Sequence, residues 1–142
     1  MTNKRWNLAL GLAVLLFAAL ACKFSATTAN ISSLKVAKDK AATQETSTFA
    51  PTDAVYGVAE ISNASEKLKA KGRLVADDVE GMPAGPIPGA ETTLDLPGSS
   101  TATFTFTPPP DGWPKGKYKL EVTMMNEGGE QKDQKTESFT VS

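Results

Sequence analysis

The chain has 142 residues, a length that suits one domain rather than two. Its 15 basic and 16 acidic residues give a net charge of −1, which argues against a protein that binds nucleic acid through bulk positive charge. Histidine is absent and cysteine occurs once. These absences exclude Ser-His-Asp and Cys-His catalysis, metal sites built on histidine or on several cysteines, and an internal disulfide. We therefore expect a non-catalytic protein with no cofactor and no nucleic-acid partner.

Residues 1–21 have the pattern of a secretory signal peptide. Lys4 and Arg5 supply the positive charge at its start, and residues 8–20 form an apolar run without a charge. Small residues come just before Cys22. A membrane-spanning helix needs roughly 20 apolar residues, so this shorter run is better explained as a signal that is removed.

The single cysteine lies at the end of this run. The sequence Ala19-Leu20-Ala21-Cys22 resembles the lipobox of bacterial lipoproteins. The resemblance implies that the Cys22 thiol carries diacylglycerol, that the chain is cut before Cys22, and that the new amino group is acylated with a fatty acid such as palmitate. Two or more acyl chains anchor a protein stably in a membrane. The alternative is an ordinary secreted protein with a stray cysteine near its cleavage site.

The lipobox predicts attachment to a membrane of the cell envelope. Because Lys23 rather than aspartate follows the cysteine, the resemblance favours the outer membrane in a bacterium with two membranes, and otherwise the outer face of the cell membrane. Residues 22–30 are expected to be the acylated cysteine and a short polar tether. Without residues 1–21 the net charge is −3. The folded domain is expected over residues 31–142.

The pattern of the folded domain is that of β-strands. Short stretches alternate apolar and polar residues, clusters of proline and glycine separate them, and no long stretch has an apolar period of 3.6. Proline and glycine predict a loop over residues 77–89, and Asn-Glu-Gly-Gly predicts a hairpin turn over residues 126–129. Seven strands are predicted, over residues 31–38, 54–62, 67–76, 92–96, 101–107, 117–124 and 132–141.

Two stretches resemble the immunoglobulin-like domains of bacterial envelope lipoproteins. In residues 48–58, Thr-Phe-Ala-Pro-Thr-Asp leads into Val-Tyr-Gly-Val, and residues 112–120 contain the Gly-x-Tyr pattern that opens the sixth strand of many such domains. With the strand count, the resemblance implies an all-β, immunoglobulin-like antiparallel β-sandwich of about seven strands over residues 31–142. Many of these families have no assigned activity, so the resemblance indicates a fold rather than a function.

The chain departs from antibody-type domains in its core. It has no cysteine pair to bridge the sheets, and Gly72 and Leu74 stand in the third strand where antibody domains have a tryptophan. The core is therefore expected to depend on aliphatic side chains and on five larger ones. These are Phe104, Phe106, Tyr118, Leu120 and Phe139.

Two aromatic residues have alternative interpretations. Tyr118 is either a tyrosine corner, whose hydroxyl bonds to upstream backbone, or a plain core aromatic. Trp113, between Gly112 and Pro114, either caps the end of the sandwich or is an exposed aromatic that binds a partner. The rigid neighbours favour capping.

Basic residues concentrate at the outward positions of the third and sixth strands, which are neighbours in this topology. Like charges opposite each other on adjacent strands are destabilising, so a basic face suggests a partner: anionic lipid headgroups, acidic wall polymers or an acidic protein surface. The alternative is a solvated face that discourages edge pairing, partly neutralised by Glu66, Glu121 and Glu137. The basic residues are Lys67, Lys69, Lys71, Arg73, Lys117 and Lys119.

A cluster of acidic residues, Asp77, Asp78 and Glu80, precedes the predicted loop. Calcium takes six to eight oxygen ligands, and the spacing of an EF-hand is absent, so a solvated turn is favoured over a metal site. No serine or threonine lies in a recognisable nucleophile motif, and no glycine motif for phosphate is present. We expect neither a metal site nor catalytic residues.

Taken together, these patterns predict a lipid-anchored binding or scaffolding module of the cell envelope. Its basic face and the loops around Trp113 and residues 81–89 would contact an envelope protein or an anionic polymer. The alternative is an inhibitor or assembly helper for envelope enzymes, in which the stiff loop at residues 81–89 would enter a cleft.

Overall fold

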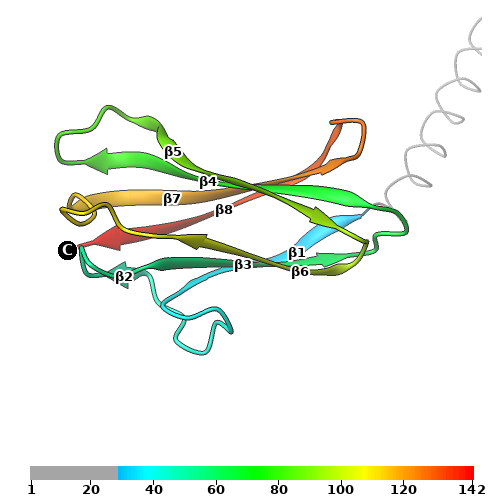
Figure 1. The fold of residues 1–142 in the computed structure, drawn as a ribbon, viewed down its shortest axis with the longest axis horizontal. Helices are drawn as coiled ribbons and strands as arrows, with labels where there is room; N and C mark the ends of the chain where they lie inside the picture. The colour runs from blue at the N-terminus through cyan, green and yellow to red at the C-terminus, as the bar shows by residue number, and fades with distance from the viewer. Residues whose placement is uncertain (1–28) are drawn as a thin grey trace, which may run out of the picture.

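The computed structural model describes residues 29–142, which form two β-sheets packed face to face (Figure 1). Within this range no helix is long and apolar enough to span a bilayer. The predicted signal peptide, Cys22 and residues 23–28 of the tether lie outside the described residues. The strands are β1 (Asn30–Ala37), β2 (Thr48–Phe49), β3 (Val55–Ser62), β4 (Leu68–Val79), β5 (Gly85–Leu96), β6 (Ser100–Phe106), β7 (Gly116–Asn126) and β8 (Gln131–Val141).

The predicted all-β, immunoglobulin-like sandwich is confirmed. One sheet has the order β1-β3-β6 and the other the order β2-β8-β7-β4-β5. All seven predicted strands are present, and β2 is a short addition that pairs in parallel with the end of β8. Every other pairing is antiparallel.

Each sheet contributes one glycine that makes room for a large side chain of the other sheet. A Cβ on Gly72 of β4 would lie 2.6 Å from Cδ1 of Phe104, and a Cβ on Gly57 of β3 would collide with Cδ2 of Leu120. The five large side chains expected in the core are all buried. The rings of Tyr118 and Phe139 stack with centroids 5.3 Å apart. The two sheets therefore pack through contacts between a glycine backbone and a large side chain, where antibody-type domains use a disulfide and a tryptophan.

The predicted loop over residues 77–89 is wrong. β4 continues to Val79, a short turn follows, and β5 already begins at Gly85. The two strands shift register, so that Arg73 lies opposite Glu91 and Val75 opposite Pro86. β5 is the edge of its sheet. A proline is tolerated there because one side of an edge strand needs no hydrogen-bond donor.

The sandwich has two distinct ends (Figure 1). At one end, which we call the amino-terminal end, β1 begins and Asn30 pairs with Ser62 of β3. The turn between β7 and β8 lies there as well. At the other, which we call the far end, lie the turn 80–84 and the loop 107–115, together with the carboxyl terminus. The backbone N–H of Ser142 bonds to the carbonyl of Phe49 there, at 3.1 Å.

Candidate functional site

The predicted basic face is a face of mixed charge. β4 and β7 are neighbours, as predicted. However, Arg73 lies opposite Glu121, and its Nη2 is 2.6 Å from the Glu121 carboxylate. Lys71 Nζ lies 3.1 Å from Glu91 of β5. The expectation of like charges opposite each other is therefore wrong, because the register places acidic or uncharged residues of β5 and β7 opposite the basic residues of β4.

Three of the remaining lysines of this face also have acidic neighbours. Lys119 Nζ is 3.7 Å from the Asp77 carboxylate. Lys117 lies opposite Asp78 in the β4–β7 ladder, and Lys69 lies opposite Asp95 in the β4–β5 ladder. In residues 29–142 the three lysines without an ion pair within 4.0 Å on this face are Lys67, Lys69 and Lys117, and they sit at its two ends. Each ion pair between exposed side chains on this face contributes about 0–1 kcal/mol to the free energy of unfolding.

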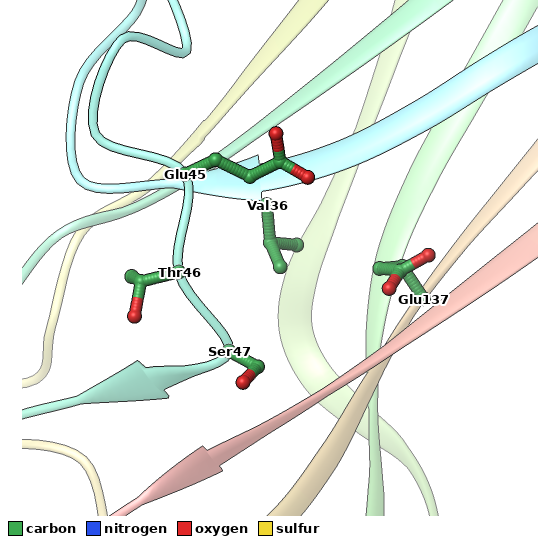
Figure 2. Close-up of a pocket in the computed structure, with 5 residues that line it drawn as sticks. All are labelled: Val36, Glu45, Thr46, Ser47 and Glu137. Atoms are coloured by element: carbon green, nitrogen blue, oxygen red, sulfur yellow. The ribbon is translucent and has the colours of Figure 1, made fainter.

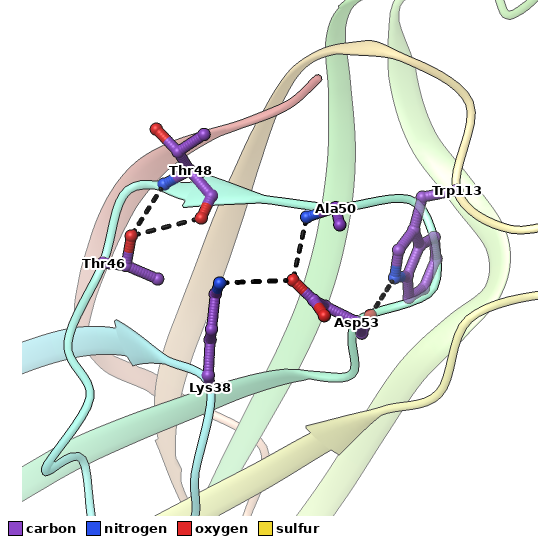
Figure 3. Close-up of polar contacts among 6 residues, drawn as sticks. All are labelled: Lys38, Thr46, Thr48, Ala50, Asp53 and Trp113. Atoms are coloured by element: carbon purple, nitrogen blue, oxygen red, sulfur yellow. Dashed lines mark hydrogen bonds and ion pairs between the residues drawn. The ribbon is translucent and has the colours of Figure 1, made fainter.

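Trp113 lies in the core at the far end. Its side chain is 7 % exposed, so the interpretation as an exposed binding aromatic is wrong and the ring caps the sandwich. Its Nε1–H donates to the carbonyl of Asp53 at 2.8 Å, and its backbone N–H donates to the carbonyl of Pro51 at 2.8 Å. The Asp53 carboxylate in turn accepts from the Ala50 N–H and pairs with Lys38 (Figure 3). These bonds fix the loop 107–115 to the segment after β2.

Of the two interpretations of Tyr118, the structure selects the tyrosine corner. Its hydroxyl donates to the carbonyl of Pro114, four residues upstream. The ring meets Trp113 edge to face, with centroids 6.4 Å apart. Burial raises the pKa of the Tyr118 hydroxyl above its usual value of 10.0, so the donating, protonated form is favoured in the folded protein.

Replacing Tyr118 by phenylalanine is expected to lower the free energy of unfolding by about 1 kcal/mol, the typical worth of one hydrogen bond. The variant also removes a pH dependence. Above pH 10 the unfolded chain loses the Tyr118 proton before the folded chain does, so the stability of the parent falls as pH rises. Urea unfolding at neutral pH and above pH 10 measures both effects. An equal alkaline loss in parent and variant would contradict this assignment.

The far end holds together the suggested contact loop around Trp113 and the turn 80–84, which contains the part of the suggested segment 81–89 that lies outside β5. The N–H of Glu80 donates to the carbonyl of Lys115 at 3.0 Å, which joins the turn 80–84 to the loop 107–115. Each segment is also closed internally, by Met82 N–H to Val79 at 3.2 Å and by Gly112 N–H to Pro109 at 2.8 Å. Exposed residues on these segments are Glu80, Gly81, Pro83, Ala84, Thr107, Pro109, Pro110, Asp111 and Lys115.

The acidic cluster before the turn does not converge. Asp77 pairs with Lys119, and Asp78 lies beside Lys117 along the ladder. In residues 29–142 no three acidic or cysteine side chains are grouped so that they could hold a metal ion.

A pocket that the sequence analysis missed opens between β1 and β8. Its volume is about 500 Å³, and its lining residues are Val36, Glu45, Thr46, Ser47 and Glu137 (Figure 2). Glu137 was expected near the basic residues, but it pairs with Leu120 and therefore points to the inner side of its sheet. The alternation of residues 132–141 contains this signal, because Glu137 shares a face with buried Phe139.

The rim of this pocket belongs to an ordered segment between β1 and β2. The carboxylate of Asp39 accepts hydrogen bonds from the Thr43 hydroxyl and from the backbone N–H groups of Gln44 and Thr43. The Thr43 hydroxyl and then the Gln44 N–H hold the pKa of Asp39 below its usual value. Among the described residues that line the pocket, two are carboxylates and none is basic, a lining that does not suit an anion.

No protein-family model matches the chain, and no curated protein matches its sequence. Among solved structures, a β-glucuronidase of Bacteroides uniformis is 12% identical with a TM-score of 0.54, over 80% of this chain and 14% of that one. An immunoglobulin-like protein of Pseudomonas aeruginosa, PA1606, is 12% identical with a TM-score of 0.48, over 80% and 96%. The PmoD soluble domain of Methylocystis sp. is 19% identical with a TM-score of 0.43, over 77% and 89%. At these identities the likeness concerns the fold alone.

Proposed function

We propose that the chain is a lipid-anchored, non-catalytic binding or scaffolding module of the cell envelope, and that it contacts its partner with the far end. The observation that carries this proposal is the joining of the turn 80–84 to the loop 107–115 at the end opposite Asn30. Cys22 lies eight residues before Asn30 in the sequence. A lipid on Cys22 would therefore hold the amino-terminal end near the membrane and leave the far end accessible.

The exposed surface of the far end suits a protein partner. Its prolines have a fixed φ, and its two segments are bonded to each other, so binding orders little additional chain. The exposed residues are mainly proline, glycine and alanine, with two acidic residues, Glu80 and Asp111, and one basic residue, Lys115. A rigid surface of low charge is better matched to an envelope protein than to an anionic polymer. The mixed charges on β4 and β7 support the same preference.

The second candidate is an inhibitor or assembly helper for envelope enzymes. The β4–β5 hairpin favours it, because the hairpin ends in a narrow turn rather than a broad loop. Inhibition of a panel of envelope enzymes by the chain, and its loss when Ala84 in the turn becomes lysine, would select this function.

A pull-down from detergent-solubilised envelopes tests the proposal with the full chain as bait. Substituting two exposed far-end residues, Ala84→Lys and Pro110→Lys, is expected to lower partner retention at least tenfold. A matched bait carries Ser65→Lys and Pro97→Lys at exposed turns of the amino-terminal end and should retain the partner. All baits must first show the same folded circular dichroism spectrum.

A further bait carries Lys67→Glu and Lys69→Glu, two of the lysines that form no ion pair on the mixed-charge face. Loss of retention by this bait alone would move the site to that face and contradict the proposal. Anchoring is checked separately: Cys22→Ser should release the chain from the membrane fraction, and a membrane-bound Cys22→Ser chain would overturn the lipoprotein assignment.

A further inference from the structure

We infer that the edge strand β6 pairs with β6 of a second copy of this chain, antiparallel and centred on Thr103. β6 is the last strand of the β1-β3-β6 sheet, and within residues 29–142 its strand partner is β3 alone. Alternate residues of an antiparallel strand direct their N–H and C=O groups to opposite sides, so β6 offers a row of free backbone groups at this edge.

The other exposed edges of residues 29–142 carry features that block strand addition. β5 contains Pro86 and Pro88 and a register shift. β1 has an irregularity between Ile31 and Ser33, and the Asp133 carboxylate accepts the Ile31 N–H at 2.8 Å. β8 is covered by β2 only at its end and carries charges at inward positions, such as Glu137. Proline, β-bulges and inward-pointing charges prevent an edge strand from pairing with a further strand, and β6 has none of these features.

The sequence of β6 is complementary to itself. Its seven residues, Ser-Thr-Ala-Thr-Phe-Thr-Phe, have Thr103 at their midpoint, and none is charged, proline or glycine. An antiparallel pairing centred on Thr103 sets Thr101 opposite Thr105 of the second copy. On the inner face it sets Ala102 opposite Phe104, a small residue beside a large one. Threonine pairs of this kind stabilise antiparallel sheets, and no like charges oppose each other across the two-fold axis.

The pairing would join two three-stranded sheets into one continuous sheet. The β3 residues next to β6 on the outer face do not disfavour this pairing, since uncharged Val58 lies beside Thr103 and Tyr56 beside Thr105. Glu60, the one charge among these neighbours, accepts a hydrogen bond from the Thr101 hydroxyl at 3.1 Å. The turn 80–84 and the loop 107–115 take no part, so the dimer would carry two separate binding ends. The dimer and the partner site can therefore fail independently.

Disulfide trapping in membranes that hold the full chain tests the pairing directly. Residues opposite each other in an antiparallel pair have Cα atoms about 4.5–5.5 Å apart, within the range that a disulfide spans. Mild oxidation of the Thr103→Cys variant should therefore give a covalent dimer. The matched control is Thr123→Cys, which is also half-buried on an outer face but lies in the centre of its sheet. The parent chain, oxidised in the same way, shows how much dimer forms through a Cys22 disulfide. Equal dimer yields from the two variants, or none from Thr103→Cys, would overturn the inference.

Sedimentation of the purified full chain in detergent provides a second test. The parent should dimerise reversibly, and Thr103→Lys, which sets two positive charges against each other on the axis, should raise the dissociation constant at least tenfold. Thr123→Lys should leave that constant unchanged. A parent that stays monomeric at every concentration, or a dimer that both variants weaken equally, would overturn the inference.

Discussion

Replacing Phe104 by alanine is expected to lower the free energy of unfolding by about 3–5 kcal/mol, one of the two largest effects we predict. Phe104 is 0% exposed, and its ring occupies the space above Gly72 of the opposite sheet. Its removal loses the burial of the ring and leaves a cavity that the strands cannot close without moving. Urea unfolding measures the loss, and Thr105→Ala on the exposed face of the same strand should change stability by less than about 0.5 kcal/mol.

A double-mutant cycle with Gly72 makes this prediction specific. In the parent, Gly72→Ala should destabilise the protein because the new methyl group would lie 2.6 Å from the Phe104 ring. In the Phe104→Ala background the same methyl group enters the cavity and should be neutral or stabilising. The coupling between the two sites is therefore expected to be favourable by at least about 1 kcal/mol. Additive effects would show that the ring does not occupy the space over Gly72.

Replacing Gly116 by alanine is the second large effect, with an expected loss of at least about 2 kcal/mol. Gly116 begins β7 with a φ of +147°, a conformation that alanine rarely adopts. A Cβ there would collide with the carbonyl oxygen of Asp78 and lie 2.6 Å from Cα of Val79. These are backbone atoms of β4, so they cannot move aside as a flexible side chain could.

The matched control for this prediction is Gly81→Ala in the turn between β4 and β5. Gly81 also has a positive φ, +74°, but no atom lies within 4 Å of the position that a Cβ would take there. It should cost about 1 kcal/mol, from backbone strain alone. Thermal unfolding compares the two variants. A Gly116→Ala protein as stable as Gly81→Ala would show that the β4–β7 ladder can open at this point.

Gly116 also connects stability with the proposed site. Val79 lies opposite Gly116 in the ladder, and the next residue, Glu80, bonds to the carbonyl of Lys115. Displacing β7 from β4 here would separate the turn 80–84 from the loop 107–115. Gly116→Ala is therefore expected to weaken partner retention as well as stability, whereas Phe104→Ala should affect retention only through the folded fraction.

The secondary structure could be predicted because its causes are local. Alternation with a period of two places Phe104, Tyr118 and Leu120 on the buried faces of their strands without knowledge of any neighbour. The hairpin turn over residues 126–129 is similarly local: Gly129 adopts a φ of +85° and its N–H bonds to the carbonyl of Asn126. For Tyr118 the sequence left a tyrosine corner and a plain core aromatic as alternatives, and the hydrogen bond to the Pro114 carbonyl, four residues upstream, selects the corner.

What the sequence could not supply was which charges, prolines and pockets meet across strands. Of the three acids expected to neutralise the basic residues, Glu121 does pair with Arg73, but Glu137 lies on the inner side of its sheet and the unexpected Glu91 of β5 pairs with Lys71. The sequence predicts a loop at Pro86 and Pro88, but the sheet order makes β5 an edge strand, which tolerates proline. Trp113 is buried because the segment after β2, about sixty residues earlier, supplies carbonyls for both of its N–H groups.

Most of the strands, the faces they bury and the class of fold can thus be derived from the amino-acid sequence, because the alternation of side chains and the chemistry of turns act over a few residues. Three features emerge only when the sheets assemble: the far end joins two distant segments, β6 has a strand partner on one side only within residues 29–142, and acidic residues pair with half of the basic residues of the predicted basic face. These features depend on register and on sheet order, which long-range packing selects and no short stretch of sequence encodes.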